Sequence, residues 1–389
     1  MFLHKSLILA TGLLLTVIRA ASAATINVPA DVPTIQAGLD SSSAGDVVLV
    51  ASGTYSEHDL MMKSGVEIRS SAGANVTVID AQNLGKVFLV LNCSGGTVID
   101  GFTMTNGRGI EPYPKGGAIY AENSTFTLSA NHIVNSSAAL TGGGGYFLNC
   151  SPTIQRNVIR NNQGASDGGG IYLHYCSDAV VQSNTVCTNI GGSNGGVTYN
   201  VSSGSILDNV ICHNQGSHGG GISNDNSSLT IRRNVIFENE SGSAGGGIYC
   251  GYFGGALLIE ENTIVANSTP PGRGGGIFCA VNASPTIQKC IIAFNGEAMG
   301  CEYSTSIPTI SCSDLFGNVN GNGICGIDGG QNISADPRFC DRALDDYRLH
   351  AESPAATAPC GYMGALGVGC APPVGVESRS WSAVRVLYR

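Results

Sequence analysis

Gly168-Gly169-Gly170-Ile171-Tyr172 is one copy of a motif that occurs seven times, with drift, along the middle of the chain. The copies end at Tyr120, Phe147, Tyr172, Tyr199, Ser223, Tyr249 and Phe278, at steps of 27, 25, 27, 24, 26 and 29 residues. A second marker keeps the same period. It is an asparagine before a mostly Val/Ile pair, at Asn131, Asn157, Asn184, Asn209, Asn234 and Asn262, with Cys290 in the seventh slot. Two markers that share one period indicate a repeat architecture.

The composition of the repeat predicts strands and excludes helices. Each interior glycine would cost a helix about 1 kcal/mol, whereas Thr153-Ile154-Gln155 and Leu229-Thr230-Ile231 alternate as strands do. Three short strands per repeat fit one coil of a parallel β-helix, with coils about 4.8 Å apart, and the recurrent asparagines fit an amide ladder. We therefore predict an all-β, single-stranded, right-handed parallel β-helix of roughly ten coils. A propeller or sandwich is the alternative, although propeller blades need about 40–45 residues.

The chain divides into five predicted segments. Residues 1–23 have the positive start, apolar core and Ala21-Ser22-Ala23 cleavage site of a secretory signal peptide. Residues 24–92 form an N-terminal cap, with a helix over 33–40 and a strand over 46–50, and the first coils. Residues 93–315 are the repeats, and 316–370 are a closing coil and a cysteine-rich C-terminal cap. Residues 371–389 are a linker followed by either a sorting tail or a frayed terminus. We expect no membrane span after signal removal.

Charge and cysteine content limit the partners and the compartment. The chain has 12% charged residues and a net charge of −9, which argues against nucleic acid. We expect no cofactor. Ca²⁺ stays open, because an acidic polysaccharide would need a bridging cation to bind this acidic chain. Fourteen cysteines in an exported chain favour disulfides. Cys187/Cys212 and Cys250/Cys279 hold equivalent positions on adjacent coils, where they are either bridged or free in the core. The C-terminal Cys325, Cys340, Cys360 and Cys370 favour bridging. No cysteine spacing predicts a metal site, and we expect a monomer.

Alternation places a candidate binding surface on the outside of the solenoid. If the Ile of each motif points inward, the next residue points outward. The predicted carbohydrate-binding row is Tyr120, Phe147, Tyr172, Tyr199, Tyr249 and Phe278. The alternatives are a buried aromatic stack and a row that only flanks a loop. The neighbouring row contains three weak acid–base candidates, Glu122, His174 and Asp225. They lie about two coils apart, and acid–base catalysis needs hydrogen-bond reach, so a structural role is the stronger interpretation.

Three stretches resemble secreted right-handed β-helix proteins of the pectin-lyase-like superfamily. Residues 34–36, 45–46 and 53–57 resemble the N-terminal cap of that superfamily. The Gly-Gly-x-Ile repeats are similar to chlamydial polymorphic outer-membrane repeats, and 336–339 with 346–349 resemble the closing segment of such bacterial proteins. The superfamily includes lyases, hydrolases, esterases, epimerases and adhesins, so the resemblance implies a fold more than an activity. Ser217-His218-Gly219 matches only half of a polygalacturonase motif, and Gly53 to Glu57 matches one pectin methylesterase motif without its catalytic partners.

These observations predict a secreted or cell-surface protein of a bacterial envelope. We expect it to bind carbohydrate or other partners through its outer face without catalysis. The alternative is a polysaccharide lyase or hydrolase, which a compact group of acids, His and Arg on three adjacent coils would favour. A purely structural spacer is the third reading.

Overall fold

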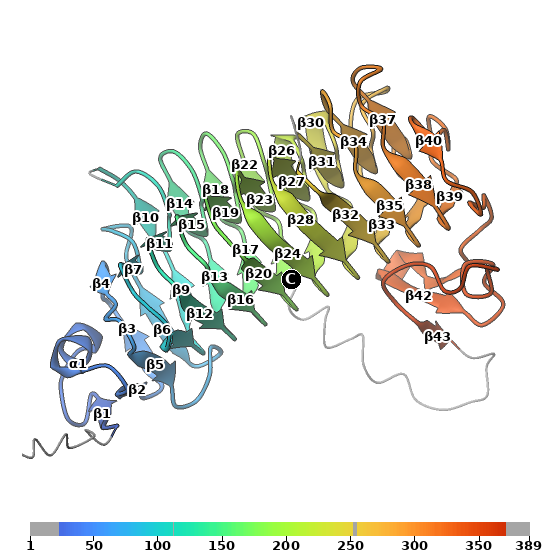
Figure 1. The fold of residues 1–389 in the computed structure, drawn as a ribbon. Coiled ribbons are helices and arrows are strands. Elements are labelled where there is room, and N and C mark those ends of the chain that lie inside the picture. Colours follow the sequence, from blue (N-terminus) through green and yellow to red (C-terminus); the bar gives the residue numbers. More distant parts are fainter. Residues whose placement is uncertain (1–22, 112, 252–254, 371–389) are drawn as a thin grey trace, which may run out of the picture.

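The computed structural model describes residues 23–111, 113–251 and 255–370. Most of the predicted signal peptide and the whole predicted tail, 371–389, lie outside these residues. The described chain winds into a parallel β-helix whose coils stack along one axis (Figure 1). The predicted fold class is confirmed.

Four parallel sheets run along the solenoid, named here A to D. Sheet A contains β1 (Thr25–Val28), β2 (Val47–Val50), β5 (Glu67–Ser70), β8 (Thr97–Asp100), β12 (Phe126–Ser129), β16 (Thr153–Gln155), β20 (Ala179–Gln182), β24 (Ser203–Leu207), β28 (Ser228–Arg232), β32 (Leu257–Glu260), β35 (Thr286–Gln288), β38 (Thr309–Ser311) and β40 (Ile327–Asp328). Sheet B contains β3 (Gly53–Tyr55), β6 (Thr77–Asp80), β9 (Thr103–Thr105), β13 (His132–Val134), β17 (Val158–Arg160), β21 (Thr185–Cys187), β25 (Val210–Cys212), β29 (Val235–Phe237), β33 (Thr263–Val265), β36 (Ile291–Ala293) and β39 (Asp314–Phe316).

The other two parallel sheets complete each coil. Sheet C contains β4 (Leu60–Met61), β7 (Phe88–Leu91), β11 (Ile119–Glu122), β15 (Gly145–Leu148), β19 (Ile171–His174), β23 (Val197–Asn200), β27 (Ile222–Asp225), β31 (Ile248–Cys250), β34 (Ile277–Cys279) and β37 (Met299–Cys301). Sheet D contains the short strands β10 (Arg108–Gly109), β14 (Ser137–Ala138), β18 (Gln163–Gly164), β22 (Ile190–Gly191), β26 (Gln215–His218) and β30 (Glu240–Ala244). In a central coil the chain runs from A to B to D to C, and then to A of the next coil.

Two buried asparagine ladders stabilise the turns on either side of sheet B. Asn157 Nδ2 donates to Asn184 Oδ1 at 3.0 Å, and Asn184 repeats this bond with Asn209. The second ladder, five residues later in each coil, makes the same bond, for example from Asn189 to Asn214 at 3.0 Å. The predicted ladder is therefore confirmed, and Cys290 follows Asn262 in the series. Buried amides are satisfied here by one another and by backbone carbonyls, as a low-dielectric interior requires.

The three glycines of the motif are needed because coils and loops approach one another closely. A Cβ on Gly168, which has a φ of +56°, would lie 2.8 Å from the ring of Tyr172. A Cβ on Gly170 would lie 2.5 Å from the carbonyl oxygen of Gly196 on the next coil. Only glycine, which has no Cβ, allows these two short distances. The close packing of the coils therefore explains why the motif is rich in glycine.

The N-terminal cap closes one end of the core. The helix α1 (Ile35–Ser41) starts two residues later than predicted, because Thr34 is its N-cap and accepts from Ala37 N at 3.1 Å. Glu57 accepts from the backbone N–H groups of Ile35 and Gln36 at 2.8 and 3.0 Å. The Gly-x-Tyr-x-Glu stretch therefore holds the cap helix in place.

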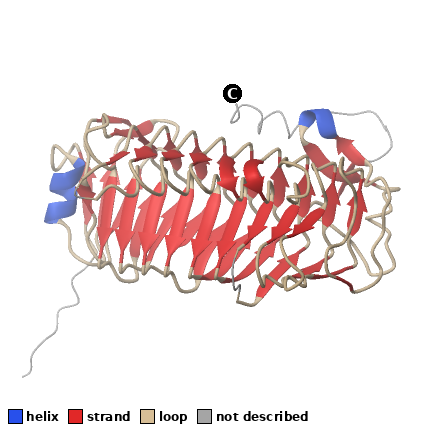
Figure 2. Ribbon diagram, turned by 90° about the horizontal axis from the view of Figure 1, so that it is seen from above, coloured by secondary structure: helices blue, strands red, loops and turns tan. Residues whose placement is uncertain are grey.

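The C-terminal cap packs beside the last coils. Its small sheet contains β41 (Phe339–Asp341), β42 (Asp346–His350) and β43 (Val368–Cys370), with the 3₁₀ turn η1 (Arg342–Leu344). Figure 2 shows α1 and this cap at opposite ends of the solenoid. Tyr347 packs on Phe237 of sheet B with ring centroids 5.1 Å apart, and Ala365 N donates to Thr263 Oγ1 at 2.9 Å. The cap thus covers an apolar part of the outer face of sheet B.

Three disulfides are present among the described residues: Cys187–Cys212, Cys301–Cys325 and Cys340–Cys370. Cys250 and Cys279 stack unbridged in the core, so the two predicted inter-coil pairs take different forms. Cys360, predicted to be bridged, is free. In the described part of the chain, no helix has the length and apolarity to cross a membrane.

Candidate functional site

The outer face of sheet C carries two rows of side chains. Ile171 and Leu173 point into the core, so Tyr172 and His174 point outward. The outer row, in register from coil to coil, is Leu89, Tyr120, Tyr146, Tyr172, Thr198, Ser223, Tyr249 and Phe278. The second row is Leu91, Glu122, Leu148, His174, Asn200 and Asp225.

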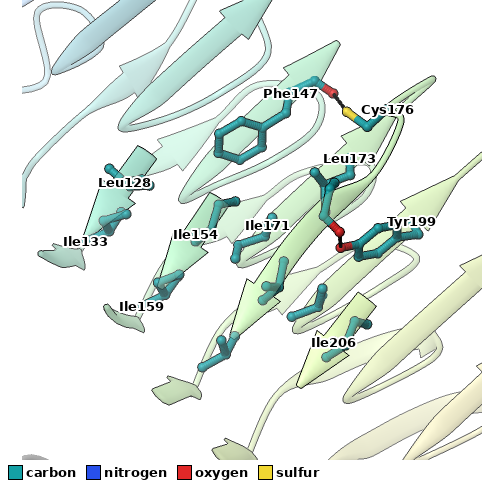
Figure 3. Close-up of a cluster of buried hydrophobic side chains, with 14 of the residues drawn as sticks. Leu128, Ile133, Phe147, Ile154, Ile159, Ile171, Leu173, Cys176, Tyr199 and Ile206 are labelled. Atoms are coloured by element: carbon teal, nitrogen blue, oxygen red, sulfur yellow. Dashed lines mark hydrogen bonds between the residues drawn. The ribbon is translucent and has the colours of Figure 1, made fainter. Parts of the chain in front are cut away.

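The predicted row is wrong at Phe147 and Tyr199, whose side chains lie in the core (Figure 3). Phe147 pairs with Leu173, and Tyr199 OH donates to the carbonyl of Ala179 at 2.9 Å. The motif copies slip by one residue at both places. Gly145 replaces the inward isoleucine in one coil, and Asn194 takes the place of the first glycine in another. The residues in the outer row at these two coils are Tyr146 and Thr198.

The outer-row rings stack on one another and are almost inaccessible. Tyr120, Tyr146 and Tyr172 have centroids 5.8 and 5.6 Å apart with interplanar angles of 18° and 14°. Tyr249 and Phe278 stack similarly at 5.9 Å. The exposed fractions are 6, 1, 8, 5 and 2%. Because each stacked face is already covered, these rings offer edges and hydroxyls to a ligand and no open face for a sugar to stack on.

Three tyrosines beside this row have accessible rings. Tyr175 follows the second row, is 53% exposed and stacks on His174 with centroids 4.1 Å apart. Tyr113 is 44% exposed and lies 5.3 Å from the ring of Tyr120. Tyr303, 56% exposed, holds the position equivalent to Tyr175 five coils further along the same sheet. Among the described residues, these three rings on this side of the solenoid are accessible to a sugar.

The three predicted acid–base residues share the second row but do not meet. Register places Glu122 and Asp225 each two coils from His174, on opposite sides of it. Glu122 accepts from Tyr120 OH at 3.0 Å, and the Nδ1 of His174 lies 3.0 Å from Tyr146 OH. Burial, with a smaller effect from Lys115, lowers the pKa of His174. At neutral pH this histidine is therefore mainly neutral and hydrogen-bonds to a tyrosine.

Thr198 and Ser223 interrupt the aromatic row on two adjacent coils, and we call this pair the polar gap. Tyr172 lies on the coil before it and Tyr249 on the coil after it. Both gap side chains are completely buried, and neither Thr198 Oγ1 nor Ser223 Oγ has a hydrogen-bond partner among the described residues. The buried Asn194 Oδ1 also lacks one. Buried polar atoms are nearly always satisfied in proteins, so this group is unusual.

Two half-buried carboxylates lie on either side of the polar gap. Asp167, in the loop before Gly168, accepts from Asn194 Nδ2 at 2.6 Å and from Gly168 N at 2.8 Å. Asp225 lies at the end of β27, and no hydrogen bond to its side-chain oxygens occurs within the described residues. Burial is the main reason that the pKa of each is raised, and the charge of Asp225 raises that of Asp167 further. The nearby His218 acts in the opposite direction on Asp225.

Sequence reasoning placed Asp225 on this face, noted His218 only within a half-matched polygalacturonase motif, and did not bring Asp167, Asn194 or His218 to this site. Asp167 and Asn194 belong to loops before sheet C, and His218 ends β26 of sheet D, so the search for alternation in the sheet C strands did not cover them. One signal was available. In the copy that ends at Tyr199, Asn194 replaces the first glycine and Thr198 replaces the ring, so both departures fall in one coil. Two departures from the repeat sequence in one coil indicate that this coil has a structural or functional role that the neighbouring coils do not share.

Nothing in residues 23–111, 113–251 and 255–370 groups three or more His, Cys, Asp or Glu side chains as a metal site. Calcium prefers six to eight oxygen ligands with several carboxylates. Asp167 and Asp225 alone do not form such a set.

Comparisons with known proteins agree with this geometry. A family model described as a right-handed β-helix region matches residues 64–194. The chain has the right-handed parallel β-helix fold. The structure of the pectate lyase Pel9A is similar at 15% identity and a TM-score of 0.52, covering 85% of this chain and 88% of that one. The PL6 family alginate lyase AlyGC matches at 13% identity and a TM-score of 0.42, covering 82% and 54%. No curated protein sequence matches.

Proposed function

We propose that this chain is an exported β-helix protein that binds a carbohydrate chain along the outer face of sheet C without cleaving it. The observation that carries the proposal is the interruption of a buried aromatic stack by the polar gap. Above the buried hydroxyls of the gap, two half-buried carboxylates, His174 and Asn200 gather beside the accessible ring of Tyr175. Hydroxyl-rich ligands are recognised by this combination of polar groups and an aromatic face.

Two further facts support the proposal. Pel9A, which shares the fold, is by its name a lyase of pectate, so a carbohydrate ligand is compatible with a solenoid of this shape. Disulfides persist in oxidising compartments, and three of them in the described chain favour export. Binding to a second protein through the same face is the other form of the proposal.

The proposal is tested by affinity electrophoresis on a panel of neutral, acidic and cationic polysaccharides, with and without Ca²⁺. At least one polymer should retard the protein. Tyr175→Ala should weaken that retardation about tenfold or more, because it removes the accessible stacking surface. Tyr303→Ala is the comparison, since Tyr303 is 56% exposed and holds the position equivalent to Tyr175 five coils further along the same face, beyond the polar gap. No retardation by any polymer, or equal effects of the two variants, would refute the proposal.

Polysaccharide cleavage is the second candidate, and one observation favours it. His218 and Asp225 lie on one coil and Asp167 lies two coils before it, and the charge of Asp225 affects the pKa of Asp167. Two carboxyls with raised pKa values can divide the roles of acid and base in glycoside hydrolysis. The same incubations should be assayed for new reducing ends and unsaturated products. Product that disappears in Asp225→Asn would establish catalysis and remove the binding-only proposal.

A further inference from the structure

Among the described residues, no hydrogen bond reaches the Asp225 carboxylate, and the environment of this group explains why that matters. Glu122 is bonded to Tyr120, and Asp167 to Asn194 and Gly168. Asp225 Oδ1 lies so close to the backbone of Gly251 that a Cβ there would be 1.8 Å away. A half-buried carboxylate that is confined in this way, and that receives no hydrogen bond from the described residues, has lost water without receiving donors from them in return.

The charges around the polar gap are predominantly negative. Asp167 and Asp225 face it from the loop and strand sides. Lys115, three coils before the gap, is held over the ring of Tyr146 at 4.7 Å and donates to its hydroxyl at 3.2 Å. Arg273 precedes Gly274 on the coil of Phe278, two coils after the gap. His174 is mainly neutral, and the ring of His218 lies edge-on to Tyr249 with centroids 5.4 Å apart. Arg232 and Arg233 are paired with Glu261 and Asp208 at the turn between sheets A and B.

This charge distribution discriminates between classes of sugar. A uronate chain would bring carboxylates toward two carboxylates, which costs free energy in a partly desolvated site. A neutral sugar would bring no positive charge to the half-buried carboxylate of Asp225. A protonated amino sugar supplies a positive charge and three N–H donors, which suit that carboxylate.

Resting on the carbohydrate-binding function proposed above, we infer that the ligand is an amino-sugar chain. Its protonated amine binds Asp225 at the polar gap. Asp167, which already accepts a hydrogen bond from Asn194, adds a second negative charge further along the bound sugar chain. Tyr175 supplies the ring against which a neighbouring sugar packs. The site is therefore selective for a cationic glycan, although the solenoid resembles that of a pectate lyase.

The test is isothermal titration calorimetry of the full mature protein with three hexasaccharides of similar length. These are β-1,4-linked glucosamine, its fully N-acetylated form and oligogalacturonate. Glucosamine hexamer should bind at least about tenfold more tightly than the acetylated form, because acetylation removes the charge. Oligogalacturonate should bind more weakly still, with or without Ca²⁺.

Variants locate the contact. Asp225→Asn should weaken binding of the glucosamine hexamer about tenfold and weaken binding of the acetylated form by a clearly smaller factor. Asp208→Asn is the control, because it removes a charge of the same sign from the turn between sheets A and B. Asp167→Asn should have a smaller effect in the same direction. It also keeps the test decisive if Asp225→Asn does not fold, as judged by circular dichroism.

Binding should depend on pH in a direction that the charges fix. Affinity for the glucosamine hexamer should fall as pH drops and Asp225 and Asp167 are protonated. It should fall again as pH rises and the amine loses its proton. Glu122, Lys115, His174, His218 and Tyr172 also face this surface, so the Asp225→Asn profile is the reference that isolates the acidic limb.

The outcomes separate the two proposals. Equal or tighter binding of the acetylated or uronate hexamer, with Tyr175→Ala still weakening it, would overturn the amino-sugar inference and leave carbohydrate binding intact. A glucosamine affinity unaffected by both Asp225→Asn and Asp167→Asn would also overturn it. Binding of no hexamer and no polymer of the panel would overturn both. If Ca²⁺ bound tightly and promoted uronate binding, the positive charge at the site would be a metal ion and not an amine, and the inference would be refuted.

Discussion

The side-chain amide of Asn184 donates to Asn209 Oδ1 at 3.0 Å, and its backbone N–H donates to the same oxygen at 2.8 Å. Asn184 Oδ1 in turn accepts the equivalent two bonds from Asn157, at 3.0 and 2.9 Å. Each ladder residue therefore satisfies backbone and side-chain groups of its neighbours at once. The stack stays in register because a shifted coil would leave several buried polar groups without partners.

The first prediction concerns this ladder. Asn184→Ala should lower the free energy of unfolding by about 3 kcal/mol or more, because several buried donors and acceptors lose partners at about 1–3 kcal/mol each. The control is Asn75→Ala, an exposed asparagine, which should change stability by less than about 0.5 kcal/mol. Urea denaturation followed by circular dichroism measures both. Similar midpoints for the two variants would show that the ladder contributes little.

The second prediction separates two glycines. Gly170→Ala should destabilise the protein by about 1–3 kcal/mol, because the new Cβ would lie 2.5 Å from a backbone oxygen and a coil must shift. Gly95 has no atom within 4 Å of an added Cβ. Gly95→Ala should therefore be neutral or slightly stabilising. Thermal unfolding measures the melting temperatures of both variants. A melting temperature of Gly170→Ala equal to that of the wild type would contradict the structural role of the motif.

The third prediction is a pH dependence that arises from Asp314. This residue is completely buried, Oδ1 accepts from Ala335 N at 3.1 Å, and Oδ2 has no partner among the described residues. Burial raises its pKa from 3.8 to about 7. The folded state therefore holds the proton more tightly than the unfolded state. Stability from this group is full below about pH 4 and is lost as pH rises toward 7, at about 1.4 kcal/mol per pKa unit.

Asp314→Asn removes this dependence. The variant should match the wild type near pH 4 and exceed its stability at pH 8. Asp208→Asn, which alters an exposed ion pair, should follow the wild-type profile within about 1 kcal/mol. Denaturation midpoints measured from pH 4 to 8 decide the matter, and parallel profiles for Asp314→Asn and wild type would contradict the assignment.

The fourth prediction concerns the thiols. Cys312 and Cys360 are half-buried, whereas Cys93, Cys150, Cys176, Cys250, Cys279 and Cys290 are buried. Alkylation of the folded, unreduced protein should modify only the half-buried pair, and slowly at Cys312, where burial raises the pKa to about 11. In denaturant without reductant, all eight should react. Mass spectrometry counts the adducts, and fewer than eight after denaturation would reveal disulfides beyond the three described.

The repeat was easier to predict than the site, for a physical reason. The ladder asparagines and motif glycines are required in nearly every coil, so their period is visible in the sequence. Outward-facing positions are predicted from the alternation of inward and outward residues. When one residue of the motif is replaced, the predicted inward and outward positions move by one residue. Gly145 and Asn194 did this, and Phe147 and Tyr199 were placed on the wrong face. Asp167 lies in a loop and His218 ends β26 of sheet D, outside the alternating strands of sheet C, so only the assembled coils bring them near Asp225.

Hydroxyl-radical footprinting with and without a bound glycan locates the binding surface without any substitution. Tyr113, Tyr175 and Tyr303 lie beside sheet C and are accessible, with exposed fractions of 44, 53 and 56%. Tyr303 holds the position equivalent to Tyr175 five coils further along the sheet. Binding at the polar gap should protect Tyr175, and to a lesser extent Tyr113, while Tyr303 keeps its rate of oxidation. Protection of Tyr303 with no change at Tyr175 would place the glycan away from the polar gap and contradict the proposed function.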